Sequence, residues 1–531
     1  MAITRGENFQ QVPINIVGSS TFGRYPKISL EKTYNMFISD NFLVDYAGYE
    51  STILNGFESL GANGRALYAS NVFDFLVAVV SNAVYIIRII YNPSLTNPYQ
   101  FVPTQVGILD SYSTDVYIAE NNNNQILISD QQNLYVVQPI TAPLFQTLTA
   151  VSLGFTPGYV SFHDGRFLCA SRGTNNWRLS DPDASNASTT VVFPNTPAFI
   201  GPLSVKPDTV QAVVPVPSRG NMVLVFGENV AQAWFDTAGQ LFPYTPNLSF
   251  NIDYGCANPS TIAFTDEVIV WLATNEKSGP VIMISDGGTP RKISTDGIDF
   301  VLSNLANPAS AEAFIYRQDG HLFYHINFIQ DNLSLFCDLS NEERFFHASD
   351  ENGNYFIAKQ VAFLNNQYYF VSRNNGNLYA FDTLYTTYDG AEIPRIRVCK
   401  HIRLPTQDYF ILNDLGFTIE QGETDPQPTG EVINFLVAQN GNFLVTQDGN
   451  SLITQDSGAP LYVNPRVDLS ISYDGGASFN SYVPYELNSI GNRINKLLWW
   501  QLGMSNDIVP QFRFWGLGRF VATDGIANIR I

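Results

Sequence analysis

The chain has 531 residues, of which 45% are hydrophobic and 13% aromatic but only 14% charged, and its formal net charge is −20. Scarce charge with abundant Tyr, Phe, Asn, Gly and Pro is typical of strands and turns rather than of helices. The acidic balance argues against tight general binding of DNA or RNA, which needs a basic face, but an acidic wall along which DNA slides without sticking remains compatible.

Residues 1–14 lack the basic-then-apolar order of a signal peptide, and the longest apolar stretch, residues 75–90, alternates as strands do. We therefore expect no membrane contact. The four cysteines contain no C-x-x-C pair and are expected to be buried thiols; they are Cys169, Cys256, Cys337 and Cys399. Neither a metal nor a cofactor is expected.

A degenerate repeat with steps near 49 residues follows the N-terminal arm and first strands, which we place at residues 1–60. Each unit contains a turn, an apolar strand, a second turn and a second strand, and another strand often precedes the hairpin. The aligned first strands of these hairpins begin at Phe75, Gln125, Phe167, Met222, Val268, Leu322 and Tyr368. Four short strands per step make one blade, so the sequence predicts an all-β protein with a β-propeller of about six to seven blades at residues 61–394. A large β-sandwich or an open stack of meanders is the alternative.

An additional C-terminal β domain is expected at residues 395–531. It contains three octads, NFLVAQNG, NFLVTQDG and NSLITQDS, at residues 434–457. A calcium roll would need Gly-Gly-bearing nonads with a carboxylate in every step, whereas the period here is eight and Asn440 replaces one carboxylate. The octads instead predict an inserted ribbon of β-hairpins at residues 433–457, whose deletion should spare the propeller.

Further along the chain, SYDGGASF fits the Asp-box of sialidase propellers. Its key positions are Ser472, Asp474, Gly476 and Phe479. The motif is a hairpin-turn device rather than an active site, because the Asp side chain accepts backbone N–H bonds and the Gly adopts a conformation that other residues avoid. We expect a structural turn here and no catalytic residue.

Two histidine patterns contain residue types that bind metals, but neither has the spacing of a metal site. His321 and His325 lie about 13 Å apart if HLFYHINF is a strand, which is too far for one ion. Cys399 and His401 share a strand face, but no third ligand lies near them in the sequence. Nucleophile-elbow, Walker and dinucleotide-binding motifs are absent, so the chain is not expected to be an enzyme.

Two segments, residues 18–40 and 467–516, carry a family resemblance. The matching positions are Thr33, Asn35, Met36, Phe37, Asp474, Gly475, Gly476, Trp499, Trp500, Leu502 and Gly503. In this order they resemble the packaged-DNA stabilisation proteins of short-tailed bacteriophages, which are tail accessory or nozzle subunits. Ala47-Gly48-Tyr49 departs from the Pro-Gly turn of that family.

The resemblance implies a structural subunit of the virion tail, made in the bacterial host cytoplasm. It implies a homo-oligomer, commonly a hexameric ring, that extends the tail tube below the portal and adaptor, retains packaged DNA and passes it through the lumen on ejection. Tail fibre or spike and plug proteins would be further partners. The alternative is a glycan-binding or glycan-cleaving, sialidase-like propeller that recognises the host surface.

Overall fold

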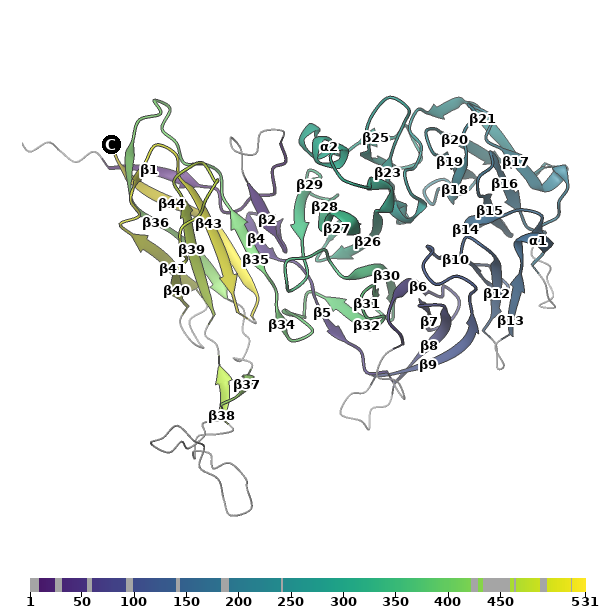
Figure 1. Cartoon of the computed structure of the whole chain (residues 1–531), viewed down its shortest axis with the longest axis horizontal. Coiled ribbons are helices and arrows are strands. Elements are labelled where there is room, and N and C mark those ends of the chain that lie inside the picture. Colours follow the sequence, from purple (N-terminus) through teal and green to yellow (C-terminus); the bar gives the residue numbers. More distant parts are fainter. Residues whose placement is uncertain are drawn as a thin grey trace, which may run out of the picture. The chain divides into compact units, whose positions relative to one another are not determined.

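A computed structural model describes residues 9–23, 31–54, 60–91, 99–139, 144–182, 191–239, 242–421, 428–432, 459–462, 465–487, 494–516 and 518–531. It contains two compact units (Figure 1). The propeller unit comprises Ser20–Pro26 and Ala47–Tyr385, and the C-terminal unit comprises Met1–Ser19, Lys27–Tyr46 and Thr386–Ile531. These bounds differ from the expected ranges 1–60, 61–394 and 395–531, because the N-terminal strands are shared between the two units.

The described part of the propeller unit contains seven blades of four neighbouring antiparallel strands, five as separate sheets and two as parts of larger sheets, and the prediction of an all-β protein with a six- to seven-bladed propeller is confirmed (Figure 1). Their strands in blade order are β6 (Gly64–Ala69), β7 (Phe75–Val80), β8 (Ala83–Tyr91) and β9 (Tyr99–Ile108); β10 (Tyr117–Glu120), β11 (Ile126–Ser129), β12 (Leu134–Gln138) and β13 (Leu144–Leu148); β14 (Pro157–His163), β15 (Arg166–Ser171), β16 (Asn176–Leu179) and β17 (Ile200–Pro202); β18 (Val210–Pro215), β19 (Met222–Gly227), β20 (Ala231–Asp236) and β21 (Tyr244–Ile252); β22 (Ala263–Phe264), β23 (Ile269–Ala273), β24 (Val281–Ser285) and β25 (Arg291–Lys292); β26 (Glu312–Gln318), β27 (His321–Phe328), β28 (Leu333–Asp338) and β29 (Arg344–Ala348); β30 (Ala358–Leu364), β31 (Gln367–Ser372), β32 (Leu378–Asp382) and β5 (Gly48–Ser51). The helices are α1 (Ala150–Leu153) and α2 (Asp296–Ser303), with single 3-10 turns η1 (Pro197–Phe199), η2 (Pro259–Thr261), η3 (Pro308–Ser310) and η4 (Ile329–Asp331).

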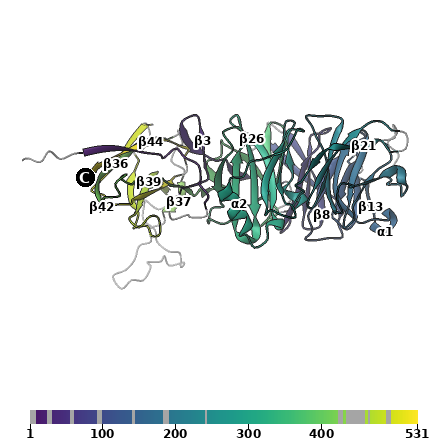
Figure 2. The same cartoon turned by 90° about the horizontal axis from the view of Figure 1, so that it is seen from above.

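The seventh blade is completed by a strand from far upstream. β5 pairs antiparallel with β32, placing Tyr49 opposite Phe381, and β30 of the same blade lies beside β6 of the first blade. The first and last blades are therefore joined through a segment that precedes all the others in sequence. This pairing closes the ring that is seen edge-on in Figure 2.

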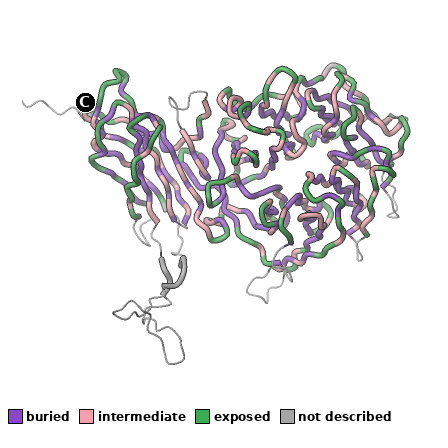
Figure 3. Tube along the Cα trace, in the orientation of Figure 1, coloured by how far each residue is buried: buried purple, intermediate pink, exposed green. Residues whose placement is uncertain are grey.

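The core of the propeller unit lies between neighbouring blades. β19 is buried along its whole length, since a blade is covered on both faces, and it therefore has a continuous apolar sequence rather than an alternating one (Figure 3). Aromatic rings fill these interfaces, as where Trp177 of the third blade meets Trp234 of the fourth edge to face at 5.6 Å.

The C-terminal unit is built from two antiparallel sheets. One has the order β3-β4-β44-β36-β41, to which β1 and β42 add, and the other has the order β2-β35-β43-β39-β40. Their strands are β1 (Phe9–Ile14), β2 (Lys32–Tyr34), β3 (Met36–Ser39), β4 (Phe42–Asp45), β35 (Arg395–Val398), β36 (Phe410–Gln421), β39 (Arg466–Ser472), β40 (Val483–Glu486), β41 (Ile494–Trp500), β42 (Met504–Ser505), β43 (Val509–Trp515) and β44 (Phe520–Arg530), and two short hairpins are β33 (Thr387–Tyr388) with β34 (Ala391–Glu392) and β37 (Pro428–Val432) with β38 (Ala459–Tyr462).

The octad segment, residues 433–457, lies outside the described residues. The strands on either side of it, β37 and β38, pair antiparallel with Val432 opposite Ala459. The segment therefore leaves and re-enters the described chain at one two-stranded ribbon. Among the described residues, no helix is long and apolar enough to cross a membrane.

Candidate functional site

The Asp-box residues form a tight turn after β39. The Ser472 hydroxyl donates to Oδ1 of Asp474 at 2.7 Å and accepts from the backbone N–H of Gly476 at 2.8 Å, and Asp474 accepts from the backbone and hydroxyl of Ser478 at 2.9 and 2.6 Å. Hydrogen bonds from Ser478 and then Ser472 hold the pKa of the Asp474 carboxyl well below its ordinary value. Gly476 has a φ of +87°, and Phe479 is half-buried. The hydrogen bonds that the Asp474 carboxylate accepts here all come from residues of the turn itself.

The turn contacts a second predicted motif. The Tyr473 hydroxyl donates to the backbone oxygen of Leu502, and Gly503 follows with a φ of +93°. The two parts of the carboxyl-terminal motif, which are separated in sequence by β40 and β41, therefore meet in space.

Thr33 and Asn35 lie in the interior of the C-terminal unit. Thr33 donates to the backbone oxygen of Gly18 at 2.6 Å and accepts from the guanidinium of the fully buried Arg397 at 3.1 Å. Asn35 adopts a φ of +53°, which Asn tolerates better than most residues, and its side chain donates to the backbone oxygen of Pro394 at 2.9 Å. Both residues fix backbone segments in place.

Trp499 and Trp500 point to opposite faces of β41. Trp499 is 4% exposed and packs on Phe417 and Phe512, whereas Trp500 is 62% exposed. Successive side chains of a β-strand point to opposite faces of the sheet, which explains why one tryptophan is buried and its neighbour is exposed.

The histidine patterns do not converge on a metal site. His321 contacts Asp338 at 2.7 Å, whereas His325 is fully buried between aromatic rings, where burial lowers the pKa of its imidazole to about 3. Cys399 is buried, and His401 contacts Asp507 at 2.8 Å. In the described ranges no group of three potential ligands lies close enough to hold a metal ion.

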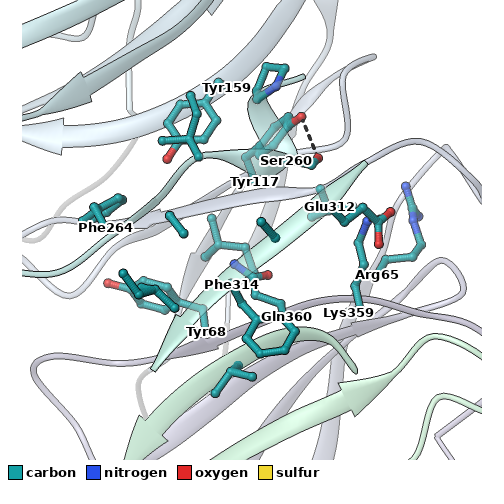
Figure 4. Close-up of a pocket in the computed structure, with 18 of the residues that line it drawn as sticks. Arg65, Tyr68, Tyr117, Tyr159, Ser260, Phe264, Glu312, Phe314, Lys359 and Gln360 are labelled. Atoms are coloured by element: carbon teal, nitrogen blue, oxygen red, sulfur yellow. Dashed lines mark hydrogen bonds and ion pairs between the residues drawn. The ribbon is translucent and has the colours of Figure 1, made fainter. Parts of the chain in front are cut away.

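A cavity of about 260 Å³ lies where the innermost strands of the propeller unit converge (Figure 4). It is lined by residues of β6, β10, β14, β26 and β30 and by the segment from η2 to β22. Figure 4 shows Arg65, Lys359 and Glu312 grouped on one side, with Tyr68 and Phe264 on the opposite side. No sequence motif predicted this site.

The charged side of the cavity is a network of ion pairs. Lys359, which is 8% exposed, donates to Asp115 at 2.8 Å and to Oε1 of Glu312, and the same oxygen contacts Arg373. Burial tends to raise the pKa of Asp115, but the ammonium group of Lys359 and the hydroxyl of Ser260 hold it below its ordinary value. Burial lowers the pKa of Lys359, an effect that Asp115 opposes. The network therefore has two cations and two carboxylates, and Arg65 beside it donates to the backbone oxygens of Ser111 and Thr114.

The signal that could have revealed this network is positional. Arg65, Asp115, Glu312 and Lys359 each stand at the beginning of the strand that precedes a predicted hairpin, in a chain of which only 14% is charged. Equivalent positions of successive blades lie at one level around a propeller axis, so charges repeated there are expected to meet.

The fold defines this protein as a β-propeller with an additional C-terminal β unit. The comparisons identify it further. The family described as "Bacteriophage P22 Gp10, beta-propeller", a phage stabilisation family, matches residues 81–386, more than half of the chain. The chain belongs to this family, as predicted from the terminal motifs, and is a structural protein of a bacteriophage virion.

Three solved structures are similar to this chain at low sequence identity and low TM-score. A streptogramin B lyase is 9% identical over 63% of this chain and 97% of its own, with a TM-score of 0.40. PorZ from Porphyromonas gingivalis is 14% identical over 60% of this chain and 37% of its own, with a TM-score of 0.35. A chain of a mitotic checkpoint complex is 12% identical over 60% of this chain and 88% of its own, with a TM-score of 0.36. No curated protein matches the sequence.

Proposed function

We propose that this protein is a ring-forming subunit of a short-tailed phage tail, the nozzle or hub below portal and adaptor, that retains packaged DNA and passes it out on ejection. The observation that carries the proposal is the family match across the propeller, residues 81–386. The family is one of stabilisation proteins, and retention of DNA is the stabilising task that a tail component can perform. An enzymatic role is not part of the proposal.

The propeller's own axis is too narrow to be the DNA path. Its cavity measures only about 260 Å³, and the Lys359 network lies along one side of it. A duplex whose major groove alone is about 12 Å wide does not fit. If this protein passes DNA, the lumen must therefore be enclosed by several copies, which supports an oligomeric ring.

The charge of the chain suits such a lumen. Six copies would carry 6 × −20 = −120 formal charges. A strongly acidic ring repels the phosphate backbone, which allows DNA to pass without tight binding.

One sheet of the C-terminal unit offers an apolar surface for contact between copies. Leu498 on β41 lies opposite Gly416 on β36, and Ile526 on β44 lies opposite the same glycine from the other side. These side chains are exposed together with others on the same sheet, which are Ile494, Trp500 and Met504. Grouped exposed apolar side chains are typical of interaction surfaces. The adaptor or portal, a fibre or spike, and a plug are the further partners that we propose.

Assembly tests this proposal. Native mass spectrometry and electron microscopy of the purified protein, alone and with its portal-side partner, should show a closed ring, with six copies as the expected number. The variant Trp500→Lys should weaken the ring while leaving the circular dichroism spectrum unchanged. A protein that remains monomeric under all these conditions would contradict the proposal.

A further inference from the structure

The axial cavity contains an unsatisfied polar atom. Glu312 is 6% exposed, and its Oε1 is shared by Lys359 and Arg373, but its Oε2 makes no hydrogen bond within the described residues. A buried carboxylate oxygen without a donor is unfavourable, because it has lost its hydrogen bonds to water and gained none in the protein. A molecule that brings a donor to this atom would remove that cost.

The charges around Glu312 select against ions. Arg65, Lys359 and Arg373 are balanced by Asp115, Asp130 and Glu312, so the cluster carries no excess charge to attract an ion, and each cation is already engaged by carboxylates or backbone oxygens. An anion would have to compete with those carboxylates. A neutral molecule with hydroxyl donors fits the cluster without breaking an ion pair.

The other walls are suited to a molecule with both hydroxyl groups and apolar faces. The hydroxyls of Tyr117 and Ser260 lie 3.2 Å apart, and Ser260 also hydrogen-bonds Asp115, so these hydroxyls add polar groups to this wall of the cavity. Tyr159 packs against Tyr117 at 4.9 Å between ring centroids, and Phe264 presents an aromatic ring that is 45% exposed. Figure 4 places Tyr159 and Phe264 on the part of the cavity away from Lys359.

The volume limits the size of the ligand. Sites for drug-sized molecules span about 300–1,000 Å³, and this cavity of about 260 Å³ is smaller. We propose that the axial cavity of the propeller is a binding site for a neutral monosaccharide unit, with a sugar hydroxyl donating to Oε2 of Glu312 and the sugar ring against Phe264. This site is independent of the proposed ring role and can exist whether or not the ring forms.

The test is a binding titration on the full-length protein. Methyl glycosides of glucose, galactose and N-acetylglucosamine represent free sugars, and lactose, whose second ring would lie outside the cavity, represents a glycan end. From the binding free energy that small ligands usually gain per non-hydrogen atom, we expect a Kd on the order of 1 mM for at least one of these sugars. Saturation-transfer NMR and calorimetry measure it.

Two matched variants locate the site. Phe264→Ala should raise the Kd about tenfold, whereas Phe42→Ala, which truncates a comparably exposed phenylalanine on β4 (42% against 45%), should leave it unchanged. Glu312→Gln, which keeps the shape of the side chain, should weaken binding as well. Failure of all four sugars to bind at about 50 mM, or equal effects of Phe264→Ala and Phe42→Ala, would overturn the proposal.

Discussion

The hydroxyl oxygen of Tyr473 lies 3.2 Å from the position that a Cβ atom on Gly503 would occupy. Gly503 also has a φ of +93°, a conformation that side chains disfavour. Gly503→Ala should therefore lower the free energy of unfolding by about 1–3 kcal/mol in a urea titration.

A second glycine of the same unit separates the two causes. Gly390 has a φ of +84° and no atom within 4 Å of a built Cβ, so Gly390→Ala carries the backbone cost alone and should destabilise less. In a Tyr473→Phe background, Gly503→Ala should also cost less, because the contacting oxygen is gone. If Gly503→Ala and Gly390→Ala lowered the free energy of unfolding equally, the contact with Tyr473 would not contribute to the loss.

The tandem tryptophans predict opposite phenotypes. Trp499→Ala removes a ring that is 4% exposed and should lower the free energy of unfolding by about 3–5 kcal/mol. Trp500→Ala should change it by less than about 0.5 kcal/mol, since this ring is 62% exposed, yet weaken assembly of the proposed ring. Denaturant titration measures the first effect, and native mass spectrometry measures the second. If Trp499→Ala impaired assembly and Trp500→Ala did not, with both variants compared at the same folded fraction, the contact between copies would lie away from Trp500.

His325 predicts a loss of stability in acid. Burial lowers the pKa of its imidazole to about 3, below the value of about 6.5 in an unfolded chain. Between these values the unfolded state binds the additional proton, so stability falls as the pH drops from about 6.5 toward 3. The expected cost is about 2 kcal/mol at pH 5 relative to neutral pH.

His325→Phe removes this proton-binding group and suits the surrounding rings of Phe314, Phe336 and Phe356. Urea titrations at pH 7 and pH 5 should show a smaller pH dependence for the variant than for the parent protein. An unchanged dependence would show that other groups cause it.

The ion-pair network predicts a large effect for one lysine and a small effect for another. Lys359→Met would leave Asp115 and Glu312 without their shared cation in a buried setting, and it should cost about 3–5 kcal/mol of folding stability. Lys292 also contacts two carboxylates, Asp296 and Asp299, but its side chain is 40% exposed, so Lys292→Met should cost less than about 1 kcal/mol. Similar losses for the two variants, compared by thermal denaturation, would contradict this account.

The propeller was predictable because its hairpins are local. Each aligned strand, such as the one that includes Phe75, pairs with the strand directly after it, and turn residues mark the link. The closure by β5 was not predictable, since Tyr49 meets Phe381 across most of the chain and no local pattern encodes that pairing. The same limit explains why the expected boundaries do not coincide with those of the compact units.

The structural motifs could be found from the sequence, but the cavity could not. The Asp-box turn is contiguous, so Ser472 and Asp474 identify it by spacing alone. Glu312 and Lys359 come from different blades, and only the ring geometry brings them together. The sequence shows that both residues stand at the beginning of equivalent strands. Only the folded structure shows that these positions lie at the same height around the propeller axis.

Electron microscopy of phage particles with and without this subunit tests the central claim most directly. Particles that contain it should show a ring at the end of the tail and filled heads, and particles that lack it should show truncated tails and empty heads from which DNA has leaked. Complete tails and retained DNA in particles without the subunit would contradict the role that we propose.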